Sequence, residues 1–204
     1  MSTDRRGRER LLMDPGWRFH RGDLGPTVVI NHGDTYTAVK AGHAGGPAGK
    51  VFDDTDWRVL DLPHDFILEQ PYDPTANVSH GFRHGAVGWY RKSFDLPAAD
   101  LGRRLWLEFD GVFRHSTVWL NGFRLGTHES GYTSFHYDIT EVAHYGGRNV
   151  LAVRVDATDI EGWWYEGGGI YRHVWLTKAP ALHVDHWGVF VAPHLNADFS
   201  RADV

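Results

Sequence analysis

The sequence has no cysteine, and methionine occurs only twice. Disulfide bonds, thiolate nucleophiles and cysteine-ligated zinc sites are therefore excluded. Long apolar runs are also missing, and a transmembrane helix needs about 18 or more consecutive apolar residues. The basic N-terminus, Met1–Arg8, is not followed by an apolar stretch of secretory length. The sequence therefore predicts no membrane-spanning helix and a cytoplasmic location.

An excess of positive charge is absent as well: 21 lysine and arginine residues stand against 26 aspartate and glutamate residues, for a net charge of −5. Nucleic-acid-binding domains usually carry a basic surface, so we expect no nucleic-acid partner. The 204 residues suffice for one domain, or for one domain and the start of another. They are too few for an eightfold βα-barrel, which typically needs about 250 residues.

What the sequence does contain is short segments in which apolar and polar residues alternate. The alternation is clear over Leu105–Phe109, Leu151–Val155 and Ile170–Leu176, and about ten segments of this kind are typical of half-buried strands. Asn121-Gly122 predicts a tight hairpin, since both residues tolerate positive φ angles. No long amphipathic helix is indicated. We therefore predict an all-β fold, an antiparallel sandwich; a closed barrel would show more even strand spacing.

Six motifs occur in an order that is similar to one known family. They are LPHDF (Leu62–Phe66), GWYRKSF (Gly88–Phe94), FDGV with VWLNG (Phe109–Gly122), GTHESGYTSF (Gly126–Phe135), NVLAVRV (Asn149–Val155) and WYEGGGIYR (Trp164–Arg172). Each motif is weak alone, whereas six in order are specific. From about Met13 to Pro193, the sequence resembles the N-terminal sugar-binding domain of family 2 glycoside hydrolases, the β-galactosidase and β-glucuronidase group.

The resemblance implies a jelly-roll sandwich, which is followed in the family by an immunoglobulin-like domain and a catalytic (β/α)8 barrel. It divides the chain into an N-terminal extension (1–12), a jelly-roll sugar-binding-like domain (13–181) and the truncated start of an immunoglobulin-like domain (182–204), with a strand expected over His183–Val191. The family's retaining chemistry needs two carboxylates about 5–5.5 Å apart. No motif here matches them, so we assign no catalytic residue and no cofactor, and we predict that the chain alone is inactive.

The candidate substrate-binding residues lie mainly in the glycine-rich loop Gly162–Gly169. The apolar C–H face of a sugar can lie on the ring of Trp163 or Trp164, and Glu166 could hold its hydroxyl groups. In the family, the loop before GIYR lies near the active site, so the resemblance implies that this loop frames the sugar pocket. The alternative is that the rings close the end of the core. We expect Tyr165 to pack inward and Trp163 or Trp164 to stay at least partly exposed.

Asn77 is a further candidate, because some family members place a substrate-contacting asparagine in the equivalent loop; the alternative is a surface turn residue. Two histidine pairs have spacings that suggest a metal site, His80 with His84 and His183 with His186. The first pair lies in a loop, and the second would place its rings on opposite faces of a strand. Since no carboxylate pattern completes either set, we predict no metal site.

Together with the resemblance, these features predict a non-catalytic N-terminal domain of a retaining family 2 glycosidase, most like a β-galactosidase, which supports the barrel and lends loops to its sugar pocket. The expected partners are a terminal β-galactoside or related sugar in the complete enzyme, and the immunoglobulin-like and barrel domains. The surface that would face the barrel is expected to be apolar and to drive self-association into a homo-oligomer. Two alternatives stay open: a free-standing carbohydrate-binding module, and a protein-interaction module.

Overall fold

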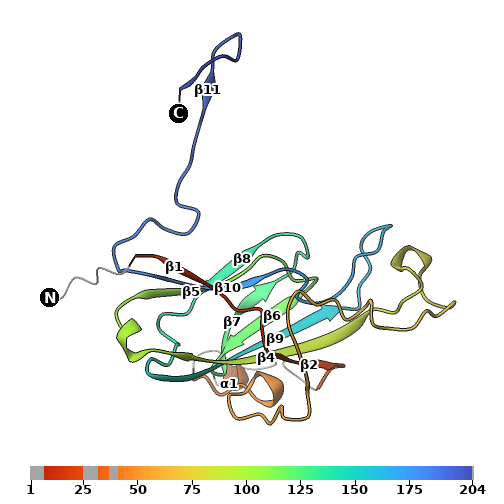
Figure 1. Cartoon of the computed structure of the whole chain (residues 1–204). Coiled ribbons are helices and arrows are strands. Elements are labelled where there is room, and N and C mark those ends of the chain that lie inside the picture. Colours follow the sequence, from red (N-terminus) through yellow and green to blue (C-terminus); the bar gives the residue numbers. More distant parts are fainter. Residues whose placement is uncertain (1–6, 25–31, 37–40, 204) are drawn as a thin grey trace.

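The computed structural model describes residues 7–24, 32–36 and 41–203. Two antiparallel sheets lie face to face around one main core (Figure 1). The larger sheet has six strands in the order β3-β2-β4-β9-β6-β7, and the smaller has four in the order β1-β10-β5-β8. This arrangement confirms the predicted all-β sandwich. It is an open sandwich and not a barrel, because each sheet ends in its own edge strands.

The six-stranded sheet consists of β3 (Arg58–Leu60), β2 (Trp17–Arg21), β4 (Ala86–Leu96), β9 (Gly147–Ala157), β6 (Ser116–Leu120) and β7 (Phe123–His128). The four-stranded sheet consists of β1 (Glu9–Leu12), β10 (Val174–Ala179), β5 (Arg104–Phe109) and β8 (Phe135–Asp138). Outside the sandwich, β11 (His194–Leu195) pairs with β12 (Ala202–Asp203). The described helices are one short α-helix, α1 (His32–Thr35), and the 3-10 turns Gly46–Ala48, Val78–His80 and Ala98–Asp100. None of these described helices could cross a membrane.

The alternation along the strands places one face of each strand in the core. In β5, Leu105, Leu107 and Phe109 are fully buried between the sheets. The neighbouring strand β10 contributes Val174 and Leu176 to the same core. Burial of one aliphatic or aromatic side chain of this size contributes about 1.5–3 kcal/mol. The period-two pattern of the sequence therefore encodes the main stabilising contact, that of one sheet with the other.

The other face of the six-stranded sheet carries a second, smaller apolar cluster. Trp89 of β4 and Trp119 of β6 stack there with ring centroids 5.6 Å apart, and Trp57 packs against the same cluster. Beside it, the buried guanidinium of Arg91 pairs with Asp54 at 2.8 Å. Because a buried charge needs such a partner, this ion pair holds the segment that precedes β3 against the sheet.

The hairpin between β6 and β7 forms as predicted. Asn121 and Gly122 have φ angles of 53° and 83° and join the two strands. The Asn121 amide also donates to the side-chain oxygen of Asn149 at 2.8 Å, and its own oxygen accepts from the Val150 N–H at 3.0 Å. One residue therefore makes the turn and ties it to the neighbouring strand β9.

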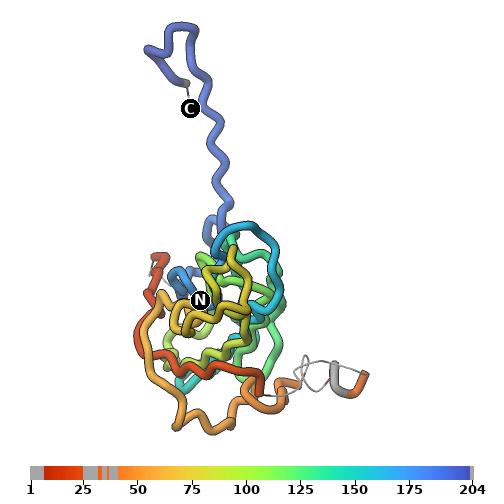
Figure 2. Tube along the Cα trace, turned by 90° about the vertical axis from the view of Figure 1, so that its right-hand side faces the viewer, coloured from red at the N-terminus to blue at the C-terminus, as the bar shows by residue number. Residues whose placement is uncertain are grey.

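Both ends of the described chain differ from the prediction. Glu9–Leu12, expected in an extension before the domain, form β1 and pair with β10. The strand expected over His183–Val191 is wrong: this segment has no strand, and the chain leaves the sandwich here toward β11 (Figures 1 and 2). A strand needs a neighbour for its backbone hydrogen bonds, and among the described residues none pairs with this segment. The interpretation of residues 182–204 as the start of a further domain stays a prediction.

Candidate ligand-binding loops

The loops that carry most of the candidate residues meet at one end of the sandwich. They comprise residues 61–85, 110–115, 129–134 and 158–173 (on the right of Figure 1). The antiparallel register brings them together: Ala86, where β4 begins, pairs with Ala157, where β9 ends. The loop before β4 and the loop after β9 therefore leave the sheet side by side.

Asp65 joins these two loops at their base. Its Oδ1 accepts from the backbone N–H groups of Ile67 at 2.9 Å and Gly168 at 3.1 Å, and its Oδ2 accepts from the Tyr165 hydroxyl at 2.8 Å. The backbone N–H of Phe66 also donates to the Gly168 carbonyl at 2.8 Å. Burial, and then the adjacent Asp65 carboxylate, raise the pKa of the Tyr165 phenol far above its usual value. The phenol therefore stays protonated and acts as the donor of this bond.

His64, the preceding residue, packs against the ring of Phe19 and makes polar contacts through both of its ring nitrogens. Its Nδ1 is 2.8 Å from the Tyr90 hydroxyl, and its Nε2 is 3.1 Å from the Glu69 carboxylate. The Arg58 guanidinium contacts the same Glu69 carboxylate at 2.7 Å. Burial lowers the pKa of His64, although the hydrogen bond to Glu69 opposes this effect. The LPHDF motif therefore has a structural role, because His64 and Asp65 hold the base of the loops through these hydrogen bonds.

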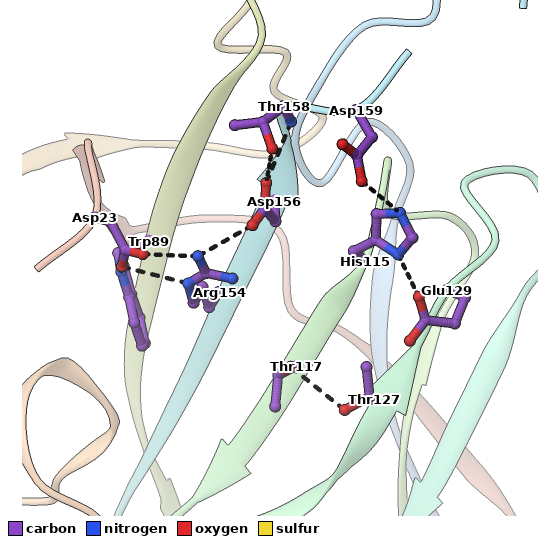
Figure 3. A network of polar contacts seen from close by, with 10 residues as sticks. All are labelled: Asp23, Trp89, His115, Thr117, Thr127, Glu129, Arg154, Asp156, Thr158 and Asp159. Carbon is purple, nitrogen blue, oxygen red and sulfur yellow. Dashed lines mark hydrogen bonds and ion pairs between the residues drawn. The ribbon is translucent and has the colours of Figure 1, made fainter. Parts of the chain in front are cut away.

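The first part of the 158–173 loop, residues 158–168 (hereafter the 158–168 loop), is fixed at its start by charged groups on the outer face of the six-stranded sheet (Figure 3). Asp156 Oδ1 accepts from the N–H and the hydroxyl of Thr158 at 3.2 and 2.6 Å. Arg154 pairs with Asp156 at 3.1 Å and with Asp23 at 2.7 Å. The hydrogen bond from Arg154 lowers the pKa of Asp23. Burial opposes ionisation of Asp156, but the bonds from Thr158 and the charge of Arg154 still hold its pKa below the usual value.

Glu166 points into the loop that carries it. Its side chain is only 1% exposed, and its two oxygens accept from the backbone N–H groups of Glu161 at 3.1 Å and Gly162 at 2.8 Å. His80 Nε2 lies 3.2 Å from Glu166 Oε2. The carboxylate therefore shapes the loop from inside. A direct contact between Glu166 and a ligand stays a prediction, and this geometry does not favour it.

Trp163, Trp164 and Tyr165 divide as predicted between the surface and the core. Trp163 is 92% exposed and Trp164 is 58% exposed, whereas Tyr165 packs against the main core cluster. The indole N–H of Trp164 donates to the Tyr132 hydroxyl at 2.9 Å. The sequence analysis did not select Tyr132, although its place in the GTHESGYTSF motif was a signal that could have drawn attention to it. The loop thus exposes two indole rings to solvent, while Tyr165 and Glu166 anchor its base.

Asn77 has a local role in this structure. Its side-chain oxygen accepts from the Ser79 N–H at 2.8 Å and caps the 3-10 turn Val78–His80. This is the contact expected of a surface turn asparagine, and a contact with substrate stays a prediction. The histidines also make separate contacts: His80 faces Glu166, and His84 pairs with Asp73 at 2.9 Å. Across the part of the chain that the structure describes, no three His, Asp or Glu side chains are grouped to hold a metal ion.

A family model described as the glycosyl hydrolase 2 galactose-binding domain-like family matches residues 59–165. This range contains the strands β4 to β9, β3 without its first residue Arg58, and most of the loops at the candidate site. The chain belongs to this family and corresponds to an N-terminal domain of family 2 glycosidases. The resemblance inferred from the six motifs is therefore confirmed.

The relatives are several times longer than this chain. β-Galactosidase BoGH2A of Bacteroides ovatus is 42% identical over 187 residues, which cover 90% of this chain and 20% of the relative. A β-glucuronidase of Formosa agariphila is 31% identical over 152 residues, 65% of this chain and 15% of the relative. A solved glycosyl hydrolase family 2 member from Bacteroides cellulosilyticus superposes with a TM-score of 0.73 at 33% identity, covering 90% of this chain and 22% of its own. The chain thus spans about a fifth of the length of such relatives.

Proposed function

We propose that this domain works as the non-catalytic N-terminal part of a retaining glycosidase that removes terminal β-galactosides, and that its 158–168 loop forms one wall of the sugar pocket. The observation that carries the proposal is the exposure of Trp163 (92%) and Trp164 (58%) on a loop whose base is anchored. Large exposed aromatic rings on a fixed support are typical of ligand or partner contacts. The galactoside is proposed because BoGH2A, at 42% identity, is a β-galactosidase.

Preorganisation supports a pocket role for this loop. A ligand that orders a mobile loop loses part of its binding free energy to that ordering. Here the loop is already held by Asp65 at Tyr165 and by the inward-facing Glu166. The indole rings can therefore meet a sugar without a rearrangement of the loop base. The isolated chain offers one wall only, so we expect its affinity for a monosaccharide to be millimolar or weaker, about 4 kcal/mol at most.

The proposal also includes the partners of the domain and its location. The exposed apolar side chains beyond β10, among them Trp187 and Phe190, are suited to contact with further domains of the same protein or with a second copy of it. Self-association of the chain and a cytoplasmic location are part of this proposal. Both are open to direct measurement, by sedimentation and by localisation of a tagged protein.

A chimeric enzyme tests the pocket role. The segment of BoGH2A that matches this chain is replaced by this chain, and hydrolysis of a chromogenic β-galactoside is measured. We expect an active chimera in which Trp163→Ala and Trp164→Ala each lower kcat/KM at least roughly fivefold, which corresponds to about 1 kcal/mol. Val51→Ala is the matched control, because Val51 is also exposed and apolar but lies in the segment that precedes β3.

Three results would contradict the proposal. An inactive chimera would show that this domain does not support such a barrel. Indole variants with the kcat/KM of the parent chimera would show that the loop is not part of the pocket. Submillimolar binding of galactose by the isolated chain, measured by tryptophan fluorescence, would instead favour a free-standing carbohydrate-binding module.

A further inference from the structure

The 129–134 segment lies beside the 158–168 loop, and His115 lies between an acidic residue of each. Nδ1 of His115 contacts the carboxylate of Glu129, and Nε2 lies 3.7 Å from Oδ2 of Asp159 (Figure 3). The backbone N–H of His115 also donates to the Glu129 carbonyl at 3.3 Å. A single imidazole thus lies between an acidic residue of the segment and an acidic residue of the loop.

Arg114 and Phe113 fix the same histidine-bearing strand end to the loop. Arg114 Nη1 lies 3.1 Å from Glu161 Oε2, and the Arg114 carbonyl accepts from the Asp156 N–H at 3.1 Å. Phe113 and Gly169 exchange both backbone hydrogen bonds, at 2.9 and 2.7 Å. The 113–115 segment therefore contacts the end of β9 at Asp156, the loop at Glu161, and Gly169 directly after the loop.

Tyr132 contacts both Phe113 of this segment and the indole of Trp164. Its hydroxyl accepts from the Trp164 indole N–H at 2.9 Å, and the centroids of its ring and the Phe113 ring are 5.4 Å apart. The preceding Gly131 packs so closely on Phe113 that a Cβ there would lie 1.9 Å from the phenyl ring, and its carbonyl accepts from the Tyr171 hydroxyl at 2.8 Å. The place of Tyr132 is thus set by Phe113, a core residue, and by Tyr171, which packs against the core, and not by the 158–168 loop that it touches.

We infer that Tyr132 is a positioning residue that sets the orientation of the Trp164 indole. The inference rests on the proposed function for its importance to sugar binding, but its geometry stands separately. The Trp164 side chain is 58% exposed, and its ring packs on Gly162, where an added Cβ would lie 2.7 Å from the indole. This contact limits the distance of the ring from the loop backbone, and the hydrogen bond from the indole edge to Tyr132 then selects one orientation of the ring. Arg114 and His115 face the acidic side chains of Glu161 and Asp159 in the loop. Tyr132 holds the ring of Trp164, so the 129–134 segment acts on a ligand through Trp164.

NMR of the ¹⁵N-labelled 204-residue chain tests the orientation directly. Tyr132→Phe removes the acceptor and keeps the ring on Phe113. The Trp164 indole resonance, identified by its loss in Trp164→Phe, should move upfield, and its exchange with water should rise roughly fivefold, the factor that a net hydrogen bond of about 1 kcal/mol gives. Tyr145→Phe is the control, because it removes a hydroxyl bonded elsewhere, to the Thr140 carbonyl. An unchanged Trp164 resonance in Tyr132→Phe, or an equal shift in the control, would overturn the inference.

The chimera with BoGH2A then separates this inference from the proposed function. Tyr132→Phe should raise KM for the β-galactoside severalfold in the parent chimera, and it should have no further effect in the Trp164→Ala background, since it acts through that ring. An equal loss in both backgrounds would show that Tyr132 acts by itself, which contradicts the inference. If Tyr132→Phe shifts the Trp164 resonance but Trp164→Ala leaves turnover unchanged, the positioning role stands and the proposed pocket function fails.

Discussion

Replacement of Asp65 should separate the two loops at the base of the candidate site. Three groups donate to this carboxylate at 3.1 Å or less: the N–H groups of Ile67 and Gly168 and the hydroxyl of Tyr165. The Leu68 N–H lies farther away, at 3.4 Å. A hydrogen bond to a charged group contributes about 1.5–3 kcal/mol net. The three bonds cannot simply be added, because Asp65 is half-buried and water can replace part of what is lost. We therefore expect Asp65→Ala to lower the free energy of unfolding by about 3 kcal/mol.

This loss of stability is large enough to be measured by thermal unfolding. In a domain of this size 1 kcal/mol corresponds to about 2–4 °C, so Asp65→Ala should lower Tm by about 6–12 °C. Asp65→Asn keeps an oxygen for the two backbone donors and should cost only about 1 kcal/mol, similar to Tyr165→Phe, which removes one donor. Since Asp65 and Tyr165 share a bond, the double variant Asp65→Ala with Tyr165→Phe should be less destabilised than the sum of the single variants. Equal Tm values for Asp65→Ala and Tyr165→Phe would refute the reasoning, because the two backbone bonds would then contribute nothing.

In urea unfolding, Trp164→Ala should cost about 1 kcal/mol, because the ring is largely exposed and loses one hydrogen bond, whereas the fully buried Trp89→Ala should cost about 3–5 kcal/mol; similar losses would place Trp164 in the core. Burial lowers the pKa of His64 in the folded state, so the unfolded chain binds the proton more readily and stability should fall as the pH drops below about 6.5. His64→Gln should reduce this slope between pH 7.5 and 5, and a slope equal to that of the exposed control His194→Gln would contradict the assignment. The isolated chain should not hydrolyse a chromogenic β-galactoside; turnover that is lost in Glu166→Gln and kept in Glu141→Gln would make this chain an enzyme.

The sequence by itself was sufficient for the fold class and the family. Alternation along β5 and β9 depends only on neighbouring residues, since successive side chains of a strand point to opposite faces. The hairpin at Asn121-Gly122 is equally local, because two positive φ angles are a property of those residues. The exposure of Trp163 and Trp164 beside an inward Tyr165 was also predictable, because a glycine-rich loop cannot bury three large rings at once.

The tertiary structure alone decided which residues meet at the end of the sandwich. Asp65 and Tyr165 are 100 positions apart, and Tyr132 and Trp164 are 32 positions apart, so no local pattern links them. The order of strands and their register bring these loops together, and the same arrangement turns Glu166 inward to its own loop. It also decided the two ends of the described chain. Glu9–Leu12 have no alternation of apolar and polar residues but gain β10 as a neighbour and form a strand. His183–Val191 have no described neighbour and form none. A strand is stable only when another strand satisfies its backbone groups, and that partner is a property of the fold and not of the segment.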